Sequence, residues 1–386
     1  MIPPTSTLDA GKTLSISVCR TPSQWKRFER TAEGIHKADP AFVPPFPGSI
    51  AKFLSPDSAF HRRHGVITAF LAERDGSPVG RVAAIINRSH NEYHKDRIGF
   101  FGFFECENNP ATAAALLNKV TEILLSNGMD AVRGPYNPSI NDDCGILLNG
   151  FDQQPIMGLP WNPSYYPTLL EGLGFKKART LYTLNLPLHR QEPPERFRRI
   201  VEHMKKRSKL KTRTMDIARL EDELVIVRDV YNATLERNWG FVPISMEDLL
   251  AAAEDIRAIA DPRLLLIGES EGRDAAVAIT LPNFNEILAA TKNTPHWLRL
   301  IHIFILMKTR KIKACRQTVL GVVPEFRDHG LHAWLIYEQF IEAKKHFSDA
   351  ALGWLEDTNS EIIKNCRLVG GETDREWAIF ESPLTA

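Results

Sequence analysis

The stretch of the sequence with the clearest chemical content is 317–335, where a β-prone run, a charged loop with one glycine and an amphipathic segment follow one another. The run 318–323 ends at Pro324, which cannot donate a ladder hydrogen bond, and apolar residues recur at helical spacing from Leu331. The free N–H groups and the dipole at the start of a helix favour a phosphate or pyrophosphate, and Arg327 adds a cation. The stretch predicts a strand–loop–helix anion site, with an ordinary strand–helix turn as the alternative. It is not a Walker loop, because no Gly-Lys-Ser/Thr sequence follows.

The order of residues in this stretch resembles the acyl-CoA-binding signature of the GNAT acetyltransferase superfamily. That signature has Arg or Gln, two residues, Gly, one residue, Gly or Ala, and a Leu three residues further on. Arg327, Gly330 and Leu335 match it, and His332 occupies the second small position. His carries a Cβ that Gly lacks, so this departure bears on how tightly the loop can hold a pyrophosphate.

The resemblance implies that acetyl-CoA or a longer acyl-CoA is the co-substrate and that no metal takes part. Main-chain groups around Leu320 to Val323 would hold the pantetheine and polarise the thioester carbonyl, and residues 327–330 would hold the pyrophosphate. The expected cofactor-binding residues are Leu320, Val322, Val323, Arg327, Asp328, His329, Gly330, Leu331, His332 and Asn359.

Acyl transfer to an amine also needs a base that removes a proton, and an acid can assist the leaving thiolate. Glu356 lies at the end of a predicted strand, and Glu286 follows a strand that is expected to border the same cleft. Each is alternatively a solvated charge at a strand end. Cys366 stands where many family members have the Tyr that protonates the thiolate, and a buried structural cysteine is the alternative.

A long polar passage between residues 134 and 166 is rich in Asn, Asp, Gly and aromatic residues, and long loops of this kind are often functional. The alternative is an irregular loop held by Asx turns and buried tyrosines. A second loop in the other half of the chain is expected to line the same cleft. The candidate substrate-binding residues are Tyr136, Asn137, Asn162, Tyr165, Tyr166, Asn238 and Trp239.

The predicted elements repeat in two halves, each with the order strand, helix, antiparallel strands, helix, strand. We expect an α/β (α+β) fold of two tandem GNAT-like domains, each a mixed twisted sheet flanked by helices. The expected divisions are a flexible arm at 1–13, a first domain at 14–190, a linker helix at 191–211 and a second domain at 212–386. The loop after Glu105 lacks the signature Arg and Gly, so the first domain is predicted to have lost acyl-CoA binding.

The composition indicates a globular protein without a bulk electrostatic preference for nucleic acid. The 386 residues are 43% hydrophobic and 25% charged, with a formal net charge of +1. The basic run at 195–211 has no interleaved aromatic residues, so a solvated helix explains it better than a nucleic-acid site. Five cysteines share no metal-ligand spacing, and no charged-then-apolar leader begins the sequence, so a reducing cytoplasmic location is expected.

An apolar segment at 297–307 is much shorter than the roughly 20 residues that span a bilayer. Lys308, Arg310, Lys311 and Lys313 follow it. A buried helix with a solvated end is one interpretation of 297–313, and peripheral contact with a membrane surface is the other.

The whole chain also resembles uncharacterised bacterial tandem-GNAT proteins, through the motifs GPYNPSIN, NPSYY, GLGF and NWGFVP. That group is similar to bacterial GNAT-type ceramide synthases, which acylate a sphingoid amine. The resemblance implies an acyl-CoA-dependent N-acyltransferase with a small-molecule or lipid amine near the interdomain cleft. A non-catalytic ligand-binding or interaction protein on the same scaffold is the alternative, and the oligomeric state stays open.

Overall fold

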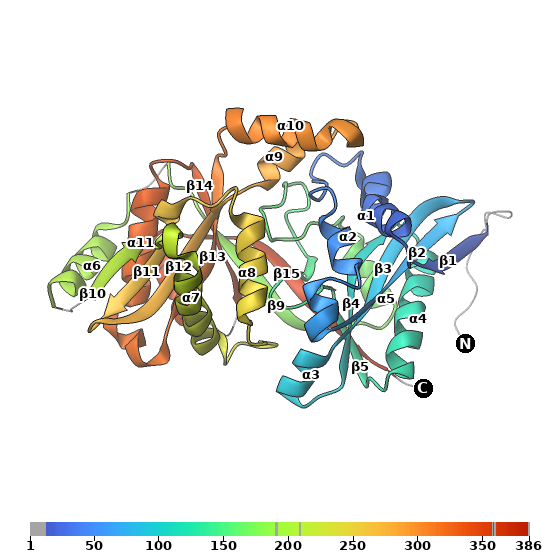
Figure 1. Cartoon of the computed structure of the whole chain (residues 1–386), viewed down its shortest axis with the longest axis horizontal. Helices are drawn as coiled ribbons and strands as arrows, with labels where there is room; N and C mark the ends of the chain where they lie inside the picture. The colour runs from blue at the N-terminus through green and yellow to red at the C-terminus, as the bar shows by residue number, and fades with distance from the viewer. Residues whose placement is uncertain (1–12, 190–191, 208–209, 357, 359, 385–386) are drawn as a thin grey trace.

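The structure, a computed structural model, describes residues 13–189, 192–207, 210–356, 358 and 360–384 (Figure 1). The first half contains, in chain order, β1 (Leu14–Val18), α1 (Pro22–His36), α2 (Ser49–Leu54), η1 (Phe60–His64), β2 (Gly65–Arg74), β3 (Ser77–Asn87), α3 (Arg88–His94), β4 (Ile98–Cys106), α4 (Pro110–Ser126), β5 (Ala131–Gly134), β6 (Tyr136–Asn137), β7 (Asp143–Cys144), β8 (Ile146–Leu147), α5 (Tyr166–Gly172) and β9 (Lys176–Leu186).

The second half contains α6 (Glu195–Arg207), β10 (Leu210–Thr214), η2 (Ile217–Arg219), α7 (Leu220–Leu235), α8 (Met246–Ile256), η3 (Pro262–Leu264), β11 (Leu265–Ser270), β12 (Arg273–Pro282), α9 (Asn285–Ala290), α10 (His296–Thr309), β13 (Ala314–Val322), η4 (Pro324–His329), α11 (Leu331–Ala343), β14 (Asp349–Glu356), α12 (Ser360–Leu368) and β15 (Glu372–Pro383). The helix predicted over the basic run at 195–211 is present as α6 but ends at Arg207, and residues 210 and 211 belong to β10. The strand, loop and helix predicted at 317–335 are confirmed.

Local signals explain why several of these helices begin where they do. The Thr21 side chain accepts from the N–H of Gln24, and the Gln24 side chain accepts in return from the N–H of Thr21. Ser245 and Asp248 form the same reciprocal pair at the start of α8. Such capping boxes satisfy two N–H groups that a helix start leaves without partners.

One mixed sheet runs through both halves, in the strand order β1-β2-β3-β4-β5-β15-β9-β14-β13-β12-β11-β10. Strand β15, near the end of the chain, lies between β5 and β9 of the first half. Strand β9 in turn pairs with β14 of the second half, from Ala350 opposite Leu186 to Glu356 opposite Leu181. The last strand of each half therefore pairs with the other half. Because the sheet is continuous through both halves, it does not mark where one domain ends and the next begins. The predicted domain boundaries at 190 and 211 stay predictions.

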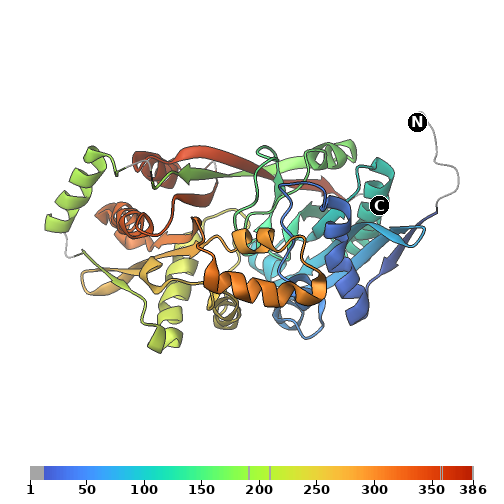
Figure 2. The ribbon, with the colours of Figure 1, turned by 90° about the horizontal axis from the view of Figure 1, so that it is seen from above.

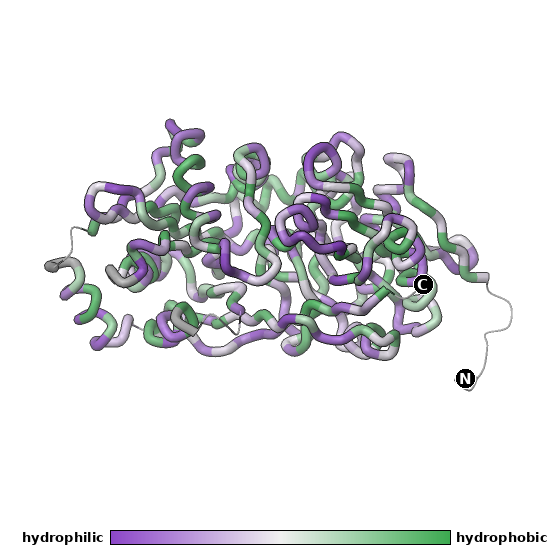
Figure 3. The backbone as a smooth tube through the Cα atoms, turned by 90° about the horizontal axis from the view of Figure 1, so that it is seen from below, coloured by the Kyte–Doolittle hydropathy of each residue, from purple (hydrophilic) through white to green (hydrophobic). Residues whose placement is uncertain are grey.

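Helices cover both faces of this sheet. In the first half, α4 and α5 pack on one face through Leu116, Leu124 and Leu170, and α1 packs on the other through Phe28. In the second half, α11 covers one face and α7 the other. Hydrophobic and hydrophilic residues alternate over short distances along the chain, as strands and helices buried on one side require (Figure 3). The mixed α/β architecture expected from the sequence is confirmed.

Helix α10 has an unusual place in this arrangement, since it lies across the top of both halves (Figures 1 and 2). It belongs to the segment between β12 and β13 of the second half. Arg299 of α10 nevertheless contacts the first half, donating to Glu33 Oε1 at 2.7 Å and to the carbonyl of Pro45 at 3.1 Å. The two halves are therefore joined here as well as through the sheet.

Candidate active site

The sheet of the second half opens between two parallel strands, β13 and β14. They pair only from Ala314 opposite Asp349 to Gln317 opposite Leu352. Beyond these residues β13 continues against β12, whereas β14 continues against β9. The facing edges of 318–322 and 353–356 are therefore not joined to each other.

Main-chain groups of Leu320 and Val322 point into this opening. The N–H of Val323 donates to the carbonyl of Ala275 at 2.9 Å, one residue beyond the Val322–Ala276 pair that ends the β12–β13 ladder. Because hydrogen-bonding direction alternates along an antiparallel strand, Gly321 also faces β12, and Leu320 and Val322 face the other way. Within the part of the chain that the structure describes, no side chain bonds the N–H of Leu320 or Val322. These two donors are available to a ligand carbonyl.

The corresponding opening in the first half is filled by the chain itself. Strands β4 and β5 pair only from Ile98 to Phe100, and the loop that follows β5 enters the space beyond. Asn137 Oδ1 accepts from the N–H of Phe103 at 2.6 Å, and the Tyr166 hydroxyl accepts from the N–H of Cys106 at 2.8 Å. The main-chain donors that are available in the second half are thus occupied here.

Tyr136 completes this filling. It is fully buried, and its ring stacks on Phe100 at a centroid distance of 4.9 Å. A Cβ at Gly102 would stand 1.7 Å from the carbonyl oxygen of Tyr136, so the loop backbone lies directly against β4. These contacts fill the space between β4 and β5 that corresponds to the opening in the second half. The predicted loss of acyl-CoA binding in the first half stays a prediction.

The loop for which an anion site is predicted leads directly into the start of α11. Gly330 has a φ of 79°, and no side chain in the described part of the structure caps the helix. The first N–H groups of α11 therefore point toward the loop without an intrahelical partner. This arrangement fits a phosphate group. Met204 of α6 lies against the same loop, because a Cβ at Gly330 would stand 2.3 Å from its sulfur.

Arg327 and His332 lie beside this helix start. Arg327 donates to the carbonyl of Thr234 at 3.0 Å and to that of Val322 at 3.4 Å, so it connects the loop to the end of α7. His332 is buried, and neither ring nitrogen has a hydrogen-bond partner among the described residues. Burial, with a smaller contribution from Arg327, lowers the pKa of His332 to about 4, so the ring is neutral at pH 7.

Three of the predicted cofactor-binding residues fall on parts that the structure does not describe. Asn359 lies outside the described residues, and so do the side chains of Asp328 and His329. Leu331 is buried in the core beneath α11, and Val323 is half-buried at the end of the strand. Their predicted contacts with acyl-CoA stay predictions.

The structure places two of the three predicted catalytic residues outside the opening. Glu286 accepts from the N–H groups of Lys313 (3.0 Å) and Ala314 (2.8 Å), and so holds the start of β13. Cys366 is buried among apolar residues of α12 and α11, and burial raises the pKa of its thiol to about 12. This geometry favours structural roles for both. Glu356 lies at the end of β14, on the wall of the opening.

A polar cluster lies around Cys144, and among its charged members the sequence analysis named only Glu356 as a candidate site residue. After burial, the largest influences on the pKa of this thiol are Asp143, Arg316, Asp142 and Glu356, so all four lie near it. Asp142 and Asp143 come from the long polar passage of the first half. Arg316 and Glu356 come from β13 and β14 of the second. The strands on either side of the opening thus contribute Arg316 and Glu356 to the same polar cluster as the two aspartates.

Arg316 fixes the position of the loop in this cleft. It donates to the carbonyls of Met157 at 2.9 Å and Gly353 at 3.0 Å, and its guanidinium lies 5.4 Å from the ring centre of Trp354. Burial lowers the pKa of Arg316 to about 10, an effect that Asp143 opposes. The side chain stays charged at neutral pH and is held by two main-chain carbonyls.

The two aspartates differ in their surroundings. Asp142 accepts from the hydroxyl of Ser139 at 2.7 Å and from its N–H at 3.2 Å, and burial raises the pKa of the Asp142 carboxyl to about 7. The Asp143 side chain is exposed in the cleft, and no hydrogen bond or ion pair holds it within the described residues. The surrounding protein still raises the pKa of Asp143, and Arg316 opposes this. Asp142 is bound to its own loop, whereas Asp143 is available.

The predicted substrate-binding residues mostly hold the first half together. Asn162 Oδ1 accepts from the N–H of Leu147 at 2.6 Å, and the Tyr165 hydroxyl donates to the carbonyl of Cys106 at 2.7 Å. Trp239, beside Asn238 in the loop after α7, packs into the core of the first half, with the Arg133 guanidinium 4.6 Å from its ring centre. These contacts favour structural roles, and substrate contact by these residues stays a prediction.

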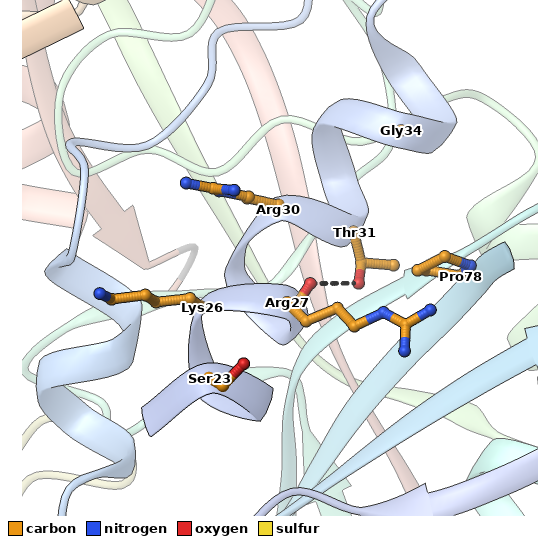
Figure 4. Close-up of a pocket in the computed structure, with 7 residues that line it drawn as sticks. All are labelled: Ser23, Lys26, Arg27, Arg30, Thr31, Gly34 and Pro78. Carbon is orange, nitrogen blue, oxygen red and sulfur yellow. Dashed lines mark hydrogen bonds between the residues drawn. The ribbon is translucent and has the colours of Figure 1, made fainter. Parts of the chain in front are cut away.

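Two cavities border helices α1 and α6. One, of about 330 Å³, lies on the outer side of α1 between Lys26, Arg27, Arg30 and Pro78 (Figure 4). Another, of about 580 Å³, borders Arg196, Arg199 and His203 of α6. Within the described ranges, no group of three or more His, Cys, Asp or Glu residues is placed to hold a metal ion.

Comparison with curated proteins gives two relatives of nearly the same length. The chain is 26% identical over 380 residues to a Caulobacter vibrioides protein named bacterial ceramide synthase, covering 96% of this chain and 98% of the relative. It is 23% identical over 364 residues to Protein YghO of Escherichia coli, covering 93% of each. No protein-family model matches the chain.

Solved structures with a similar fold include a tandem GNAT protein from the clavulanic acid biosynthesis pathway. It has a TM-score of 0.55 at 11% identity, and the match covers 97% of this chain and 99% of that one. A GCN5-related glucosamine N-acetyltransferase region of a fungal multi-domain enzyme has a TM-score of 0.58 at 14% identity, covering 99% of this chain and 40% of that longer chain. The protein therefore has the tandem GNAT fold, as its sequence motifs led us to expect.

Proposed function

We propose that the protein is an N-acyltransferase that moves an acyl group from a CoA thioester to an amine bound between its two halves. The observation that carries this proposal is the opening between β13 and β14, where the N–H groups of Leu320 and Val322 have no partner in the described structure. A thioester carbonyl placed there would be polarised by main-chain donors. The start of α11 would hold the pyrophosphate, and Arg327 would keep the loop in place.

The cleft next to this opening suits an amine. Asp142, Asp143 and Glu356 make its charge predominantly acidic, with Arg316 as the opposing cation. An ammonium ion is attracted to such a cleft, but the nitrogen must lose a proton before it attacks. We assign this proton to Asp143, whose raised pKa and exposed carboxylate suit a base. The C–N bond forms as the C–S bond breaks, and CoA leaves as a thiolate.

A lipid amine is the acceptor that we favour. The support is the 26% identity, over nearly the whole of both chains, to the Caulobacter vibrioides protein named bacterial ceramide synthase. A long-chain sphingoid amine presents one amino group for the cleft and a hydrocarbon chain that needs apolar surroundings. A cytoplasmic location remains our prediction.

A non-catalytic binding role is the second candidate. It is favoured by the contacts that Arg327 makes with the carbonyls of Val322 and Thr234, and by the position of Met204 against Gly330. In this case the signature residues would support the fold and would not hold a nucleotide.

The experiment that separates these functions has two stages. Calorimetric titration of the full chain with acetyl-CoA and palmitoyl-CoA measures binding, and mass spectrometry then follows N-acylation of a sphingoid amine. Binding with product formation supports the transferase, and binding without product supports the non-catalytic role. Absence of binding to both thioesters would overturn the acyl-CoA proposal.

A further inference from the structure

Helix α10 presents a continuous apolar face to solvent. Its members lie at helical spacing along one side of the helix: Trp297, Leu300, Ile301, Phe304 and Ile305. Trp297 is 78% exposed, Phe304 59% and Ile301 58%. Single exposed apolar residues are common on soluble proteins, but five on one helix face form a patch of the kind that marks an interaction surface.

The opposite side of α10 packs on the protein and fixes which face of the helix is exposed. Arg299, only 2% exposed, points into the protein, where it donates to Glu33 Oε1 at 2.7 Å and to the carbonyls of Pro44 and Pro45. Ile303 is buried beside it. The helix is thus fixed with Arg299 and Ile303 inward and a second set of apolar residues outward, where an ordinary surface helix turns polar residues to solvent.

Basic residues border the apolar face. Lys308 Nζ lies 4.5 Å from the ring centre of Phe304, and exposed Arg310, Lys311 and Lys313 follow the helix. The whole stretch 296–313 contains no Asp or Glu. A helix that lies in the interface of an anionic membrane has this combination of an apolar face, an interfacial Trp and adjacent cations.

The segment that carries α10 is also connected to the candidate active site. Asn283 Oδ1 accepts from the N–H of Met157 at 2.9 Å, and Asn285 donates to the carbonyl of Pro155 at 3.1 Å. The carbonyl of Met157 in turn accepts from Arg316 in the cleft. A partner surface that binds α10 would therefore lie on the side of the molecule where both halves meet (Figures 1 and 2).

We propose that the apolar face of α10, with the basic residues after it, docks the protein on the surface of an anionic bilayer. The helix lies in the plane of the interface, with Trp297 and Phe304 among the acyl chains and Lys311 and Lys313 against anionic headgroups. In the described part of the chain, no helix has the length and hydrophobicity needed to cross a membrane. This docking goes beyond the proposed acyl transfer and needs no acyl-CoA, so the two can fail separately.

Sedimentation of the full chain with vesicles tests the proposal in the absence of acyl-CoA. We expect binding to phosphatidylcholine vesicles that contain phosphatidylglycerol and much weaker binding to pure phosphatidylcholine. The double variant Trp297→Ser/Phe304→Ser should lower the partition coefficient about tenfold or more. Lys311→Glu/Lys313→Glu should also lower it about tenfold or more, and added salt should weaken wild-type binding.

Val225→Ser on α7 is the matched control, since Val225 is 40% exposed on a helix far from the patch along the chain. It should bind like the wild type, and circular dichroism should show that all variants fold. Analytical ultracentrifugation measures the competing outcome, a second copy of the chain on the same face. A wild-type dimer that Trp297→Ser/Phe304→Ser dissociates, without vesicle binding, would overturn the proposal. Wild-type binding that neither double variant weakens would overturn it as well.

Discussion

The sulfur of Met204 in α6 lies against Gly330 at the start of α11, where the acyl-CoA signature has its glycine. A Cβ added at residue 330 would stand 2.3 Å from that sulfur, and the φ of 79° at Gly330 is one that side chains rarely adopt. The backbone conformation therefore favours glycine at this position, and a Cβ would in addition displace the flexible end of the Met204 side chain. The helix predicted as a linker covers the very loop that is proposed to hold the pyrophosphate.

Gly330→Ala should accordingly cost more stability than the strained backbone alone explains. Gly272→Ala is the matched control, because Gly272 has a similar φ of 77° and a Cβ there would meet nothing within 4 Å. We expect about 1 kcal/mol of destabilisation for Gly272→Ala and roughly twice that for Gly330→Ala in urea unfolding. Met204→Ala in the Gly330→Ala background should recover the difference. Equal losses at the two glycines would show that Met204 does not constrain the loop.

Arg327→Ala should weaken both the fold and the proposed acyl-CoA site. Its guanidinium bonds the carbonyls of Thr234 and Val322, so its loss leaves two partly buried acceptors without this donor. We expect a decrease of about 1–3 kcal/mol in the free energy of unfolding and weaker acyl-CoA binding by titration. Arg273→Ala, beside Phe326 in the same loop, is the control for binding. A variant of Arg327 that folds less stably but binds acyl-CoA like the wild type would confine this residue to a structural role.

Asn137→Ala should destabilise the first half without affecting acyl transfer. The Asn137 side chain accepts from the N–H of Phe103. Phe103 has a φ of 50°, a left-handed backbone conformation that residues other than glycine seldom adopt. Removing the acceptor leaves a half-buried N–H without its partner, which costs about 1–3 kcal/mol. Thermal unfolding and the product assay measure the two effects. A loss of activity larger than the loss of folded protein would instead support the predicted role of Asn137 in substrate binding.

Secondary structure could be predicted well from this sequence because its signals are local. The Thr21–Gln24 capping box, the turn at Asp75–Gly76 and the Asn127–Gly128 helix end all lie within a few residues. The exchange of β9 and β15 between the halves could not be predicted, because each strand pairs with residues far away in sequence. Short elements without strong periodicity, such as α3 and β6, were also not predicted.

The candidate site was predictable to the extent that it depends on one continuous stretch. The loop before α11 was found because Arg327, Gly330 and Leu335 are close in sequence. Asp143 and Arg316 are separated in sequence by about the length of a whole domain and come near each other only in the folded protein. The polar passage was recognised as unusual, but its composition does not distinguish Asp143 from the neighbours that hold the loop.

Asp142→Asn should stabilise the protein at alkaline pH. The folded-state pKa of about 7 lies above the ordinary value of 3.8, so folding favours the protonated form. This group therefore has little effect below about pH 4, lowers the free energy of unfolding as pH rises from about 4 to 7, and keeps it lowered above that. Asn retains an acceptor for Ser139 and removes the charge.

For Asp142→Asn we expect a gain of about 1–2 kcal/mol in the free energy of unfolding at pH 8 and little change at pH 4, allowing for partial exposure. Urea unfolding at both pH values measures this, and an equal effect at both would contradict the burial of Asp142.

Asp143→Asn should lower the rate of acyl transfer while leaving acyl-CoA binding and the fold intact. Asp143 is exposed, and among the described residues no hydrogen bond or ion pair holds its side chain. Asn has nearly the same shape, so the substitution removes only the charge and the basicity. General-base catalysis typically contributes a factor of about 10²–10⁴, and kcat should decrease by about that much. Although Asp143 reaches solvent, the protein around its carboxyl limits hydration and raises its pKa, an effect that Arg316 opposes. The wild-type rate should therefore rise with pH through an ionisation above the ordinary value of 3.8, and the variant should lack this limb. Asp142→Asn provides the adjacent control, since that carboxylate is held by Ser139. If Asp143→Asn retains wild-type kcat and Glu356→Gln does not, the base belongs to β14 and to the carboxylate that the sequence itself indicated.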